Sequence, residues 1–270
     1  MFLATNLKFF LMAIIPALAY GMIIYISSNY KSISLKKGVA YFALGAISVT
    51  FVNAFQFTFP YFQEFSILPS MPIISLLLKA VIQIALIEEM SKWISYKFID
   101  SVRHRVELKR DKPVATMFYA CMVSAGFAVI ENIHYVIAYY NEISPGELLT
   151  TRSFSAVITH MICGLFMGYF IALANQKPTI DFSLISIILR KHPLWRKFLY
   201  TTIGITCAVL FHGFYDFIIS IGAESSIYEL IALGLLIAYS MHKKLNGLSK
   251  HRDKISRFNF LIHFLVLFIF

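Results

Sequence analysis

The sequence predicts an all-α fold, a polytopic membrane helix bundle of seven to eight transmembrane helices. Hydrophobic residues make up 59% of the 270 residues, charged residues 14%, and the mean hydropathy is +0.72, as is typical of integral membrane proteins. The apolar runs approach the ~20 residues that a membrane-crossing helix needs and far exceed the length of a barrel strand. Because only short connections join these runs, residues 1–270 are expected to form a single integral membrane domain.

Seven apolar runs define the predicted spans. In chain order they are residues 8–27, 38–59, 77–99, 114–140, 153–175, 197–221 and 227–243. A closing apolar stretch, 258–270, is short for a span and is expected to form either a thin eighth helix or an interfacial one. The first run has only Lys8 near its start and no evident small-residue cleavage site, so we expect a retained helix rather than a removed signal peptide.

The distribution of charge predicts the orientation in the membrane. Of the 24 lysines and arginines, 19 fall in four segments: 28–37, 100–113, 176–197 and 241–257. The alternate connections contain only Arg152. Lysine and arginine accumulate on the cytoplasmic side of membrane proteins, so we expect these four segments in the cytoplasm and the N-terminus outside the cell membrane. Nearby anionic lipid accounts for the net charge of +10, and no nucleic-acid partner is expected.

Ionisable side chains interrupt four of the predicted spans. Such groups are costly in a bilayer and are functional candidates by default. They are Glu88 and Glu89, Glu131, His160, and His212 with Asp216. At ~1.5 Å per helical residue, each group lies about 10–13 Å below the same face of the membrane. The core that carries them, roughly residues 77–221, is therefore expected to hold one buried centre.

The acidic motifs have informative spacings. Lys92 follows Glu88 by four residues and Glu89 by three, so it can pair with either acid across one helical turn. One acid is then left over, although a buried ion pair that only fixes helix packing is the alternative. Adjacent residues are about 100° apart on a helix, so at most one glutamate is expected to point straight into a narrow site. His134, three residues after Glu131, is a ligand, a proton relay or merely an outer-leaflet polar residue.

The histidine motifs combine close packing with a second polar group. Gly164, one turn after His160, permits close helix approach on the face that the histidine occupies. A lone histidine of this kind can also be a simple interhelical hydrogen bond. Asp216 follows His212 by four residues and is expected to accept one imidazole N–H. The other nitrogen of His212 then remains for water or a metal.

The order of these motifs resembles the PrsW family of intramembrane proteases. The pattern is EExxK (Glu88–Lys92), FxxxEN (Phe127–Asn132), a mid-helix histidine and HxxxD (His212–Asp216), from the third predicted span to the sixth or seventh. The type II CAAX prenyl proteases are distantly similar, but their motifs are EExxxR and HxxxN. The resemblance implies an endopeptidase that hydrolyses a peptide bond of a membrane-anchored protein, such as an anti-sigma factor, in a site-1-type cut near the extracytoplasmic side.

Two mechanisms fit the same side chains. We assign catalytic roles to Glu88, Glu89, Glu131, His160 and His212, and supporting roles to Lys92, Asn132 and Asp216. In one mechanism a metal such as Zn²⁺ is held by His160, His212 and Glu131, and another glutamate is the base. In the other, Glu88 or Glu89 activates water without a metal. The HExxH motif is absent, so the metal hypothesis depends on residue types alone.

Other functions are compatible with buried acids and histidines. They are a CAAX-prenyl-protease-like endopeptidase, a proton-coupled transporter and a non-catalytic membrane scaffold. The motif spans contain no proline of the kind that interrupts transport helices, which argues against a transporter. The expected partners are a membrane-anchored protein substrate and the lipid bilayer, and the sequence leaves the oligomeric state open.

Overall fold

The computed structural model describes residues 2–28, 33–64, 68–106, 111–176 and 192–249, and within these ranges all regular structure is helical. The all-α prediction is therefore confirmed. The long helices are α1 (Phe2–Ser27), α2 (Leu35–Thr58), α6 (Pro113–Ala138), α8 (Ala156–Asn175), α10 (Pro193–Ser220) and α11 (Ser225–Ser249). Six helical stretches of the described chain are long and apolar enough to cross a membrane. The predicted C-terminal helix, 258–270, lies outside the described residues.

The third predicted span, 77–99, is not one regular helix. It falls in a rod made of α4 (Pro72–Leu78), the π-helical segment η2 (Lys79–Ala85) and α5 (Leu86–Val106). Its charged residues keep it out of the six apolar stretches. A π-helical turn is rare and occurs often at functional sites, and here it directly precedes the glutamate pair. A short helix, α3 (Pro60–Glu64), connects α2 toward this rod.

The predicted outer connection, 141–152, is largely helical. Helix α7 (Pro145–Phe154) occupies it, and the chain breaks at Ser155, with φ −121° and ψ −75°, before α8 begins. This break turns the short helix α7 relative to the following span. As a result α7 packs against α1, α6 and α8 and does not lie free in solvent.

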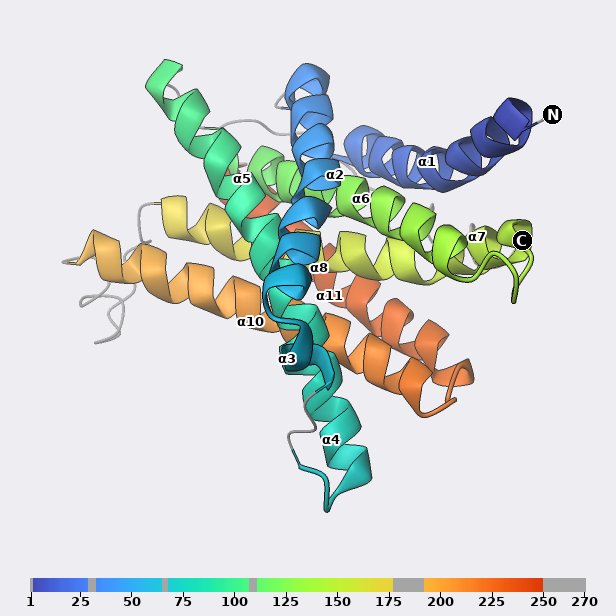
Figure 1. Cartoon of the computed structure of the whole chain (residues 1–270). Coiled ribbons are helices and arrows are strands. Elements are labelled where there is room, and N and C mark those ends of the chain that lie inside the picture. Colours follow the sequence, from blue (N-terminus) through green and yellow to red (C-terminus); the bar gives the residue numbers. More distant parts are fainter. Residues whose placement is uncertain (1, 29–32, 65–67, 107–110, 177–191, 250–270) are drawn as a thin grey trace.

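Helices α6 and α8 form the centre of the bundle. α6 packs against α2 and α8, and α8 packs against α10 and α11. In Figure 1, α6, α8 and α10 run across the view, whereas α2 and the α4–η2–α5 rod cross them. The start of α6, the end of α8 and the start of α10 lie on one side of the picture, and α7 and the α10–α11 turn lie on the other. The apolar stretches of α6 and α7–α8 are 89% buried, compared with 28–33% for the other four.

Glycines bring the site-bearing helices into close contact. A Cβ atom on Gly164 of α8 would lie 2.6 Å from Ser124 Oγ and 2.8 Å from the backbone of α6, which confirms the close approach predicted there. A Cβ atom on Gly213 of α10 would lie 2.8 Å from the Cα of Val81 in η2. Because Gly213 follows His212 directly, this crossing also sets the position of the histidine.

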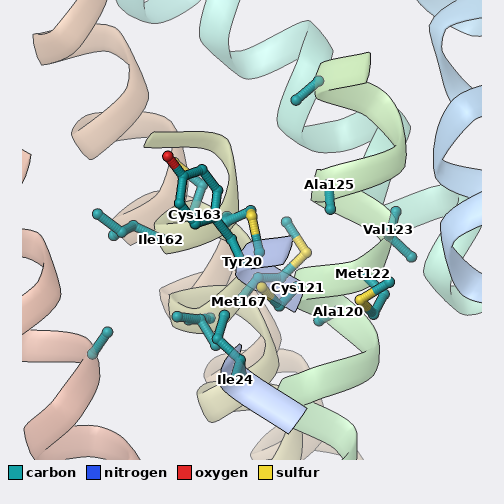
Figure 2. Close-up of a cluster of buried hydrophobic side chains, with 14 of the residues drawn as sticks. Tyr20, Ile24, Ala120, Cys121, Met122, Val123, Ala125, Ile162, Cys163 and Met167 are labelled. Carbon is teal, nitrogen blue, oxygen red and sulfur yellow. The ribbon is translucent and has the colours of Figure 1, made fainter. Parts of the chain in front are cut away.

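An apolar cluster fills the space between α1, α6 and α8. Figure 2 shows Tyr20 and Ile24 of α1 packed with Cys121 of α6 and with Cys163 and Met167 of α8. Both cysteines are buried free thiols, consistent with small packing residues. This packing holds α6 and α8 together, and Cys163 Sγ also reaches the backbone oxygen of Ala208 in α10 at 3.5 Å.

Candidate active site

The ionisable side chains of five helices meet in one buried cluster. Its members are Glu88, Glu89 and Lys92 of α5, Glu131 and Asn132 of α6, Arg152 of α7, His160 of α8, and His212 and Asp216 of α10. The two imidazole rings lie edge to face with centroids 4.7 Å apart. Glu88 is 8% exposed and Glu89 is fully buried, so the surrounding helices shield both carboxylates from solvent and lipid. The structure thus brings together all eight of the residues singled out in the sequence.

One chain of contacts runs from Lys92 to His212. Lys92 Nζ lies 2.6 Å from Glu89 Oε1, and the same oxygen lies 3.0 Å from His212 Nδ1. With Glu89 ionised, Nδ1 donates its hydrogen to the carboxylate and Nε2 keeps a lone pair. The orienting contact was expected from Asp216. Instead, Asp216 Oδ2 lies 3.5 Å from Nε2, and Glu89 orients the ring.

A second chain runs from Arg152 to His160. Arg152 Nη2 donates to Glu131 Oε2 at 2.8 Å, and Arg152 Nε donates to Asn132 Oδ1 at 2.7 Å. Glu131 Oε2 lies 2.7 Å from His160 Nε2. The other ring nitrogen of His160 lies 2.9 Å from Lys92 Nζ. Because an ammonium group is only a donor, Nδ1 accepts and Nε2 donates to Glu131.

Aromatic rings support both buried cations. Lys92 Nζ lies 4.1 Å from the ring centroid of Phe127, and Arg152 Cζ lies 3.6 Å from that of Tyr135. Cations are attracted to the faces of aromatic rings, most strongly when water is excluded. Phe127 and Tyr135 flank Glu131 on α6, one turn before and one turn after it. Helix α6 therefore contributes the acid and the rings that hold both cations in place.

Glu88 is left over from both chains. Its Oε2 lies 4.0 Å from Lys92 Nζ and 3.8 Å from His212 Nε2, and it makes no hydrogen bond. Asp216 Oδ2, on the same side of His212, also lacks a donor. Two buried carboxylate oxygens and an imidazole lone pair thus face one another, which is unfavourable unless a proton or a cation lies among them.

The two adjacent glutamates both reach the site. Glu88 approaches Nε2 of His212 and Glu89 approaches Nδ1. The expectation that at most one could point into a narrow site was therefore wrong. The imidazole of His212 lies between the two carboxylates. Although Glu88 and Glu89 are about 100° apart on the helix, each therefore approaches a different nitrogen of the same ring.

Glu88 and His212 present unpaired acceptor atoms that fit a metal ion, and His160 can join them when Lys92 Nζ releases its Nδ1. Glu88, His160 and His212 each offer a ligand atom, and these atoms lie within 4.8 Å of one another. Two histidines, one glutamate and an open fourth position make up a ligand set of catalytic zinc sites. The sequence-based set contained Glu131 instead. In the structure Glu131 holds His160 and Arg152, and Glu88 completes the group.

Two features of this region, Arg152 and the π-helical segment, were not predicted from the sequence. Arg152 was treated as a loop charge, although it is the only basic residue among the outer connections and precedes His160 by eight residues. That isolation was the available signal. His134, in contrast, is exposed on α6 and is not part of the cluster.

A centre of buried carboxylates and histidines inside an apolar helix bundle is the arrangement expected of an intramembrane hydrolase. The sequence profile described as PrsW family intramembrane metalloprotease matches residues 34–242. The chain therefore belongs to the PrsW family, and it is a multi-pass membrane protease.

Curated relatives support this assignment. The chain is 27% identical over 228 residues to "Protease PrsW" of Shouchella clausii, a match that covers 84% of this chain and 90% of the relative. It is 29% identical to the protein of that name from Oceanobacillus iheyensis, covering 76% of this chain and 80% of the relative. The relative from Halalkalibacterium halodurans is 28% identical, with 83% and 89% covered. No solved structure matches the chain.

Proposed function

We propose that Glu88, His160 and His212 form the reaction centre of this protease, and that it cleaves a membrane-anchored protein near the extracytoplasmic side. The observation that carries the proposal is Glu88 Oε2, a buried carboxylate oxygen without a donor that lies 3.8 Å from His212 Nε2. A structural ion pair leaves no acid unpaired, and a scaffold has no need of one. The leftover acid is the group expected of a hydrolase.

In the metal-dependent form, the three residues would hold a zinc ion, which would supply Lewis acidity at the carbonyl of the scissile peptide bond. Glu89 fixes the tautomer of His212 so that Nε2 presents a lone pair. Glu131 performs the corresponding task for His160 and is held by Arg152. Glu89 pairs with Lys92, and Glu131 pairs with Arg152. Each pairing favours the ionised carboxylate and holds it in position.

In the metal-free form, Glu88 is the general base. Its Oε2 has no donor and is therefore available to accept a proton from water. In this form His212 carries a proton on Nε2 as well as on Nδ1, and Nε2 donates to the developing oxyanion, whereas both ring nitrogens of His160 are engaged by Lys92 and Glu131. Both forms depend on Glu88, and only the first depends on a metal ion.

The substrate is proposed to be a single-span protein of the anti-sigma-factor kind, cut on its outer side. Support comes from the arrangement of the helices: α7 and the α10–α11 turn lie on the side opposite to the starts of α6 and α10, which follow basic segments. Cysteine labelling should accordingly find 100–113, 176–197 and 241–257 inside and 141–152 outside. Labelling of 100–113 from outside would overturn the outer placement of the cut.

The proposal is tested with the purified protein in lipid nanodiscs and a tagged single-span substrate. Cleavage is measured before chelation, after chelation with the metal content verified by mass spectrometry, and after zinc is added back. Loss and recovery of cleavage supports the metal-dependent form. Full cleavage by metal-free protein refutes that form and supports Glu88 as the base. Cleavage by a Glu88→Gln variant contradicts both, and a prenylated soluble peptide serves as the control for CAAX-type activity.

A further inference from the structure

A second feature lies beside the reaction centre. A cavity of about 420 Å³ opens between the end of α6, helix α7, the end of α10 and the start of α11. Its lining includes Tyr135, Tyr139, Thr151, Arg152, Tyr215 and Tyr228. The volume falls in the range of ~300–1,000 Å³ typical of ligand pockets. In Figure 1 these helix ends lie on the same side as α7, away from the starts of α6 and α10.

Arg152 is shared between this cavity and the reaction centre. Its Nε and Nη2 hold Asn132 and Glu131, whereas Nη1 makes no hydrogen bond to any described residue. A guanidinium group carries five donors in a fixed fork, so one edge can bind protein while the other binds a ligand. Glu131 in turn contacts His160. Only the side chain of Glu131 therefore lies between Arg152, which lines the cavity, and a proposed reaction-centre histidine.

We propose that this cavity is a substrate subsite that binds an extended stretch of polypeptide next to the scissile bond, on the outer side of the substrate's membrane span. Arg152 is the positioning residue, donating from Nη1 to a main-chain carbonyl oxygen of the substrate. The inference rests on the proposed function and adds the place where the substrate is held. Any movement of Arg152 on binding is transmitted to Glu131.

The chemistry of the lining favours a peptide as the occupant. Tyrosine rings offer flat surfaces to substrate side chains, and the hydroxyls of Thr151 and Ser225 offer hydrogen bonds to an extended backbone. Tyr215 Oη already donates to Ser155 Oγ at 3.1 Å, which fixes the wall beside α10. A polypeptide that leaves the bilayer at this level presents the unpaired carbonyl oxygens that such a wall requires.

A second cavity provides the control. It has a volume of about 550 Å³, lies between α1 and α7, and is lined mainly by apolar residues such as Leu11 and Ile15. No member of the buried cluster lines it. Thr150 lines this cavity, whereas its neighbour Thr151 lines the proposed subsite, and both threonines are exposed. The two positions therefore allow matched substitutions one residue apart.

The first test fills each cavity. In nanodiscs, Thr151→Trp is expected to lower kcat/KM for the single-span substrate about tenfold or more, and Thr150→Trp to change it less than about twofold. Ser225→Trp, from the opposite wall, is measured in parallel, and thermal unfolding identifies the folded variants. Full activity of a folded Thr151→Trp or Ser225→Trp variant overturns the subsite. Absence of cleavage by the unsubstituted protein contradicts the proposed function instead.

The second test does not require catalysis. The photo-crosslinker p-benzoylphenylalanine is placed at position 151 or 150 of the Glu88→Gln variant, which is irradiated with the same substrate. A cross-link from 151 to substrate residues just outside the span, and none from 150, supports the subsite. Equal yields from the two positions, or a cross-link from 150 alone, overturns it. Because cleavage is not measured, this outcome is independent of the reaction mechanism.

Discussion

The site contains two chains of the same composition in different surroundings. Each runs from a cation to a carboxylate to a histidine: Lys92–Glu89–His212 and Arg152–Glu131–His160. The lysine chain is sealed, with Lys92 1% and Glu89 0% exposed. The arginine chain borders a cavity, and the side chain of Glu131 is 15% exposed. The Lys92 chain is therefore suited to holding His212 in place. The Arg152 chain is suited to contacting a ligand in the cavity.

The contacts of Lys92 explain why Glu88 has no short contact to a cation. Lys92 makes its short contacts to Glu89 and His160, so its distance to Glu88 is 4.0 Å. A single ammonium group cannot satisfy both acids and the imidazole at short range. Lys92, which joins the two chains, thereby leaves the carboxylate of Glu88 without a short contact and available for the reaction.

Glu88→Gln should reduce cleavage by about 10²–10⁴-fold while the protein stays folded, because the amide keeps the shape of the side chain but neither accepts a proton nor binds a metal in the same way. Glu89→Gln should reduce both cleavage and stability, because it also breaks the contacts to Lys92 and His212. Initial rates and unfolding curves in detergent separate the two results. Full activity in both single variants and in the double variant would exclude this pair from catalysis.

Lys92→Met should destabilise the fold by roughly 3–5 kcal/mol, because it leaves the charge of Glu89 buried without a cation. The measurement is the free energy of unfolding in mixed detergent micelles. Lys79→Met, at an exposed position of the same rod, is the control and should change it by less than about 0.5 kcal/mol. Similar values for the two variants would show that the sealed chain does not stabilise the site.

Arg152→Lys should lower kcat about 10–100-fold, since a lysine cannot hold Asn132 and Glu131 together and the orientation of His160 is lost. The loss of stability should be smaller than for Lys92→Met, because Arg152 borders a cavity and water can reach the side chains left behind. Steady-state kinetics and unfolding measured on the same preparation test the contrast. A greater destabilisation than that of Lys92→Met would reverse the roles of the two chains.

Asp216→Asn should have the smallest effect, about a tenfold weaker affinity for zinc, because Asp216 Oδ2 lies near His212 Nε2 but outside the three-residue group. Competition with a zinc-sensitive dye measures the affinity. If the affinity falls as far as in Glu88→Gln, Asp216 is a ligand in its own right.

The sequence predicts most of the fold because length and hydropathy are local properties. Each of the seven predicted spans coincides with a helical stretch, with ends displaced by several residues. Helix α7 was missed because Glu147, Arg152 and several hydroxyl residues give it the average polarity of a loop. The π-helical segment was missed because no residue pattern in 79–85 distinguishes it from an α-helix.

The site was predictable as a set of residues but not as a set of contacts. Similar depths on four spans indicated that Glu88, Glu131, His160 and His212 would meet. Which acid faces which ring nitrogen depends on rotamers and on the azimuth of each helix, so the exchange of roles between Glu89 and Asp216 required coordinates. The isolation of Arg152 in the sequence marked it as unusual, but its contacts could not be predicted because they depend on the turn at Ser155.

The crossing of α10 over the wide turn of the rod has a mechanical consequence. Gly213 rests on Val81, and on either side of this point lie His212 and, two turns further along the rod, Glu88. Because α10 meets the rod this closely and is also packed along α8, the position of His212 along the rod is fixed by this contact. A larger residue at position 213 would push α10 away from the rod and widen the gap between His212 Nε2 and Glu88 Oε2.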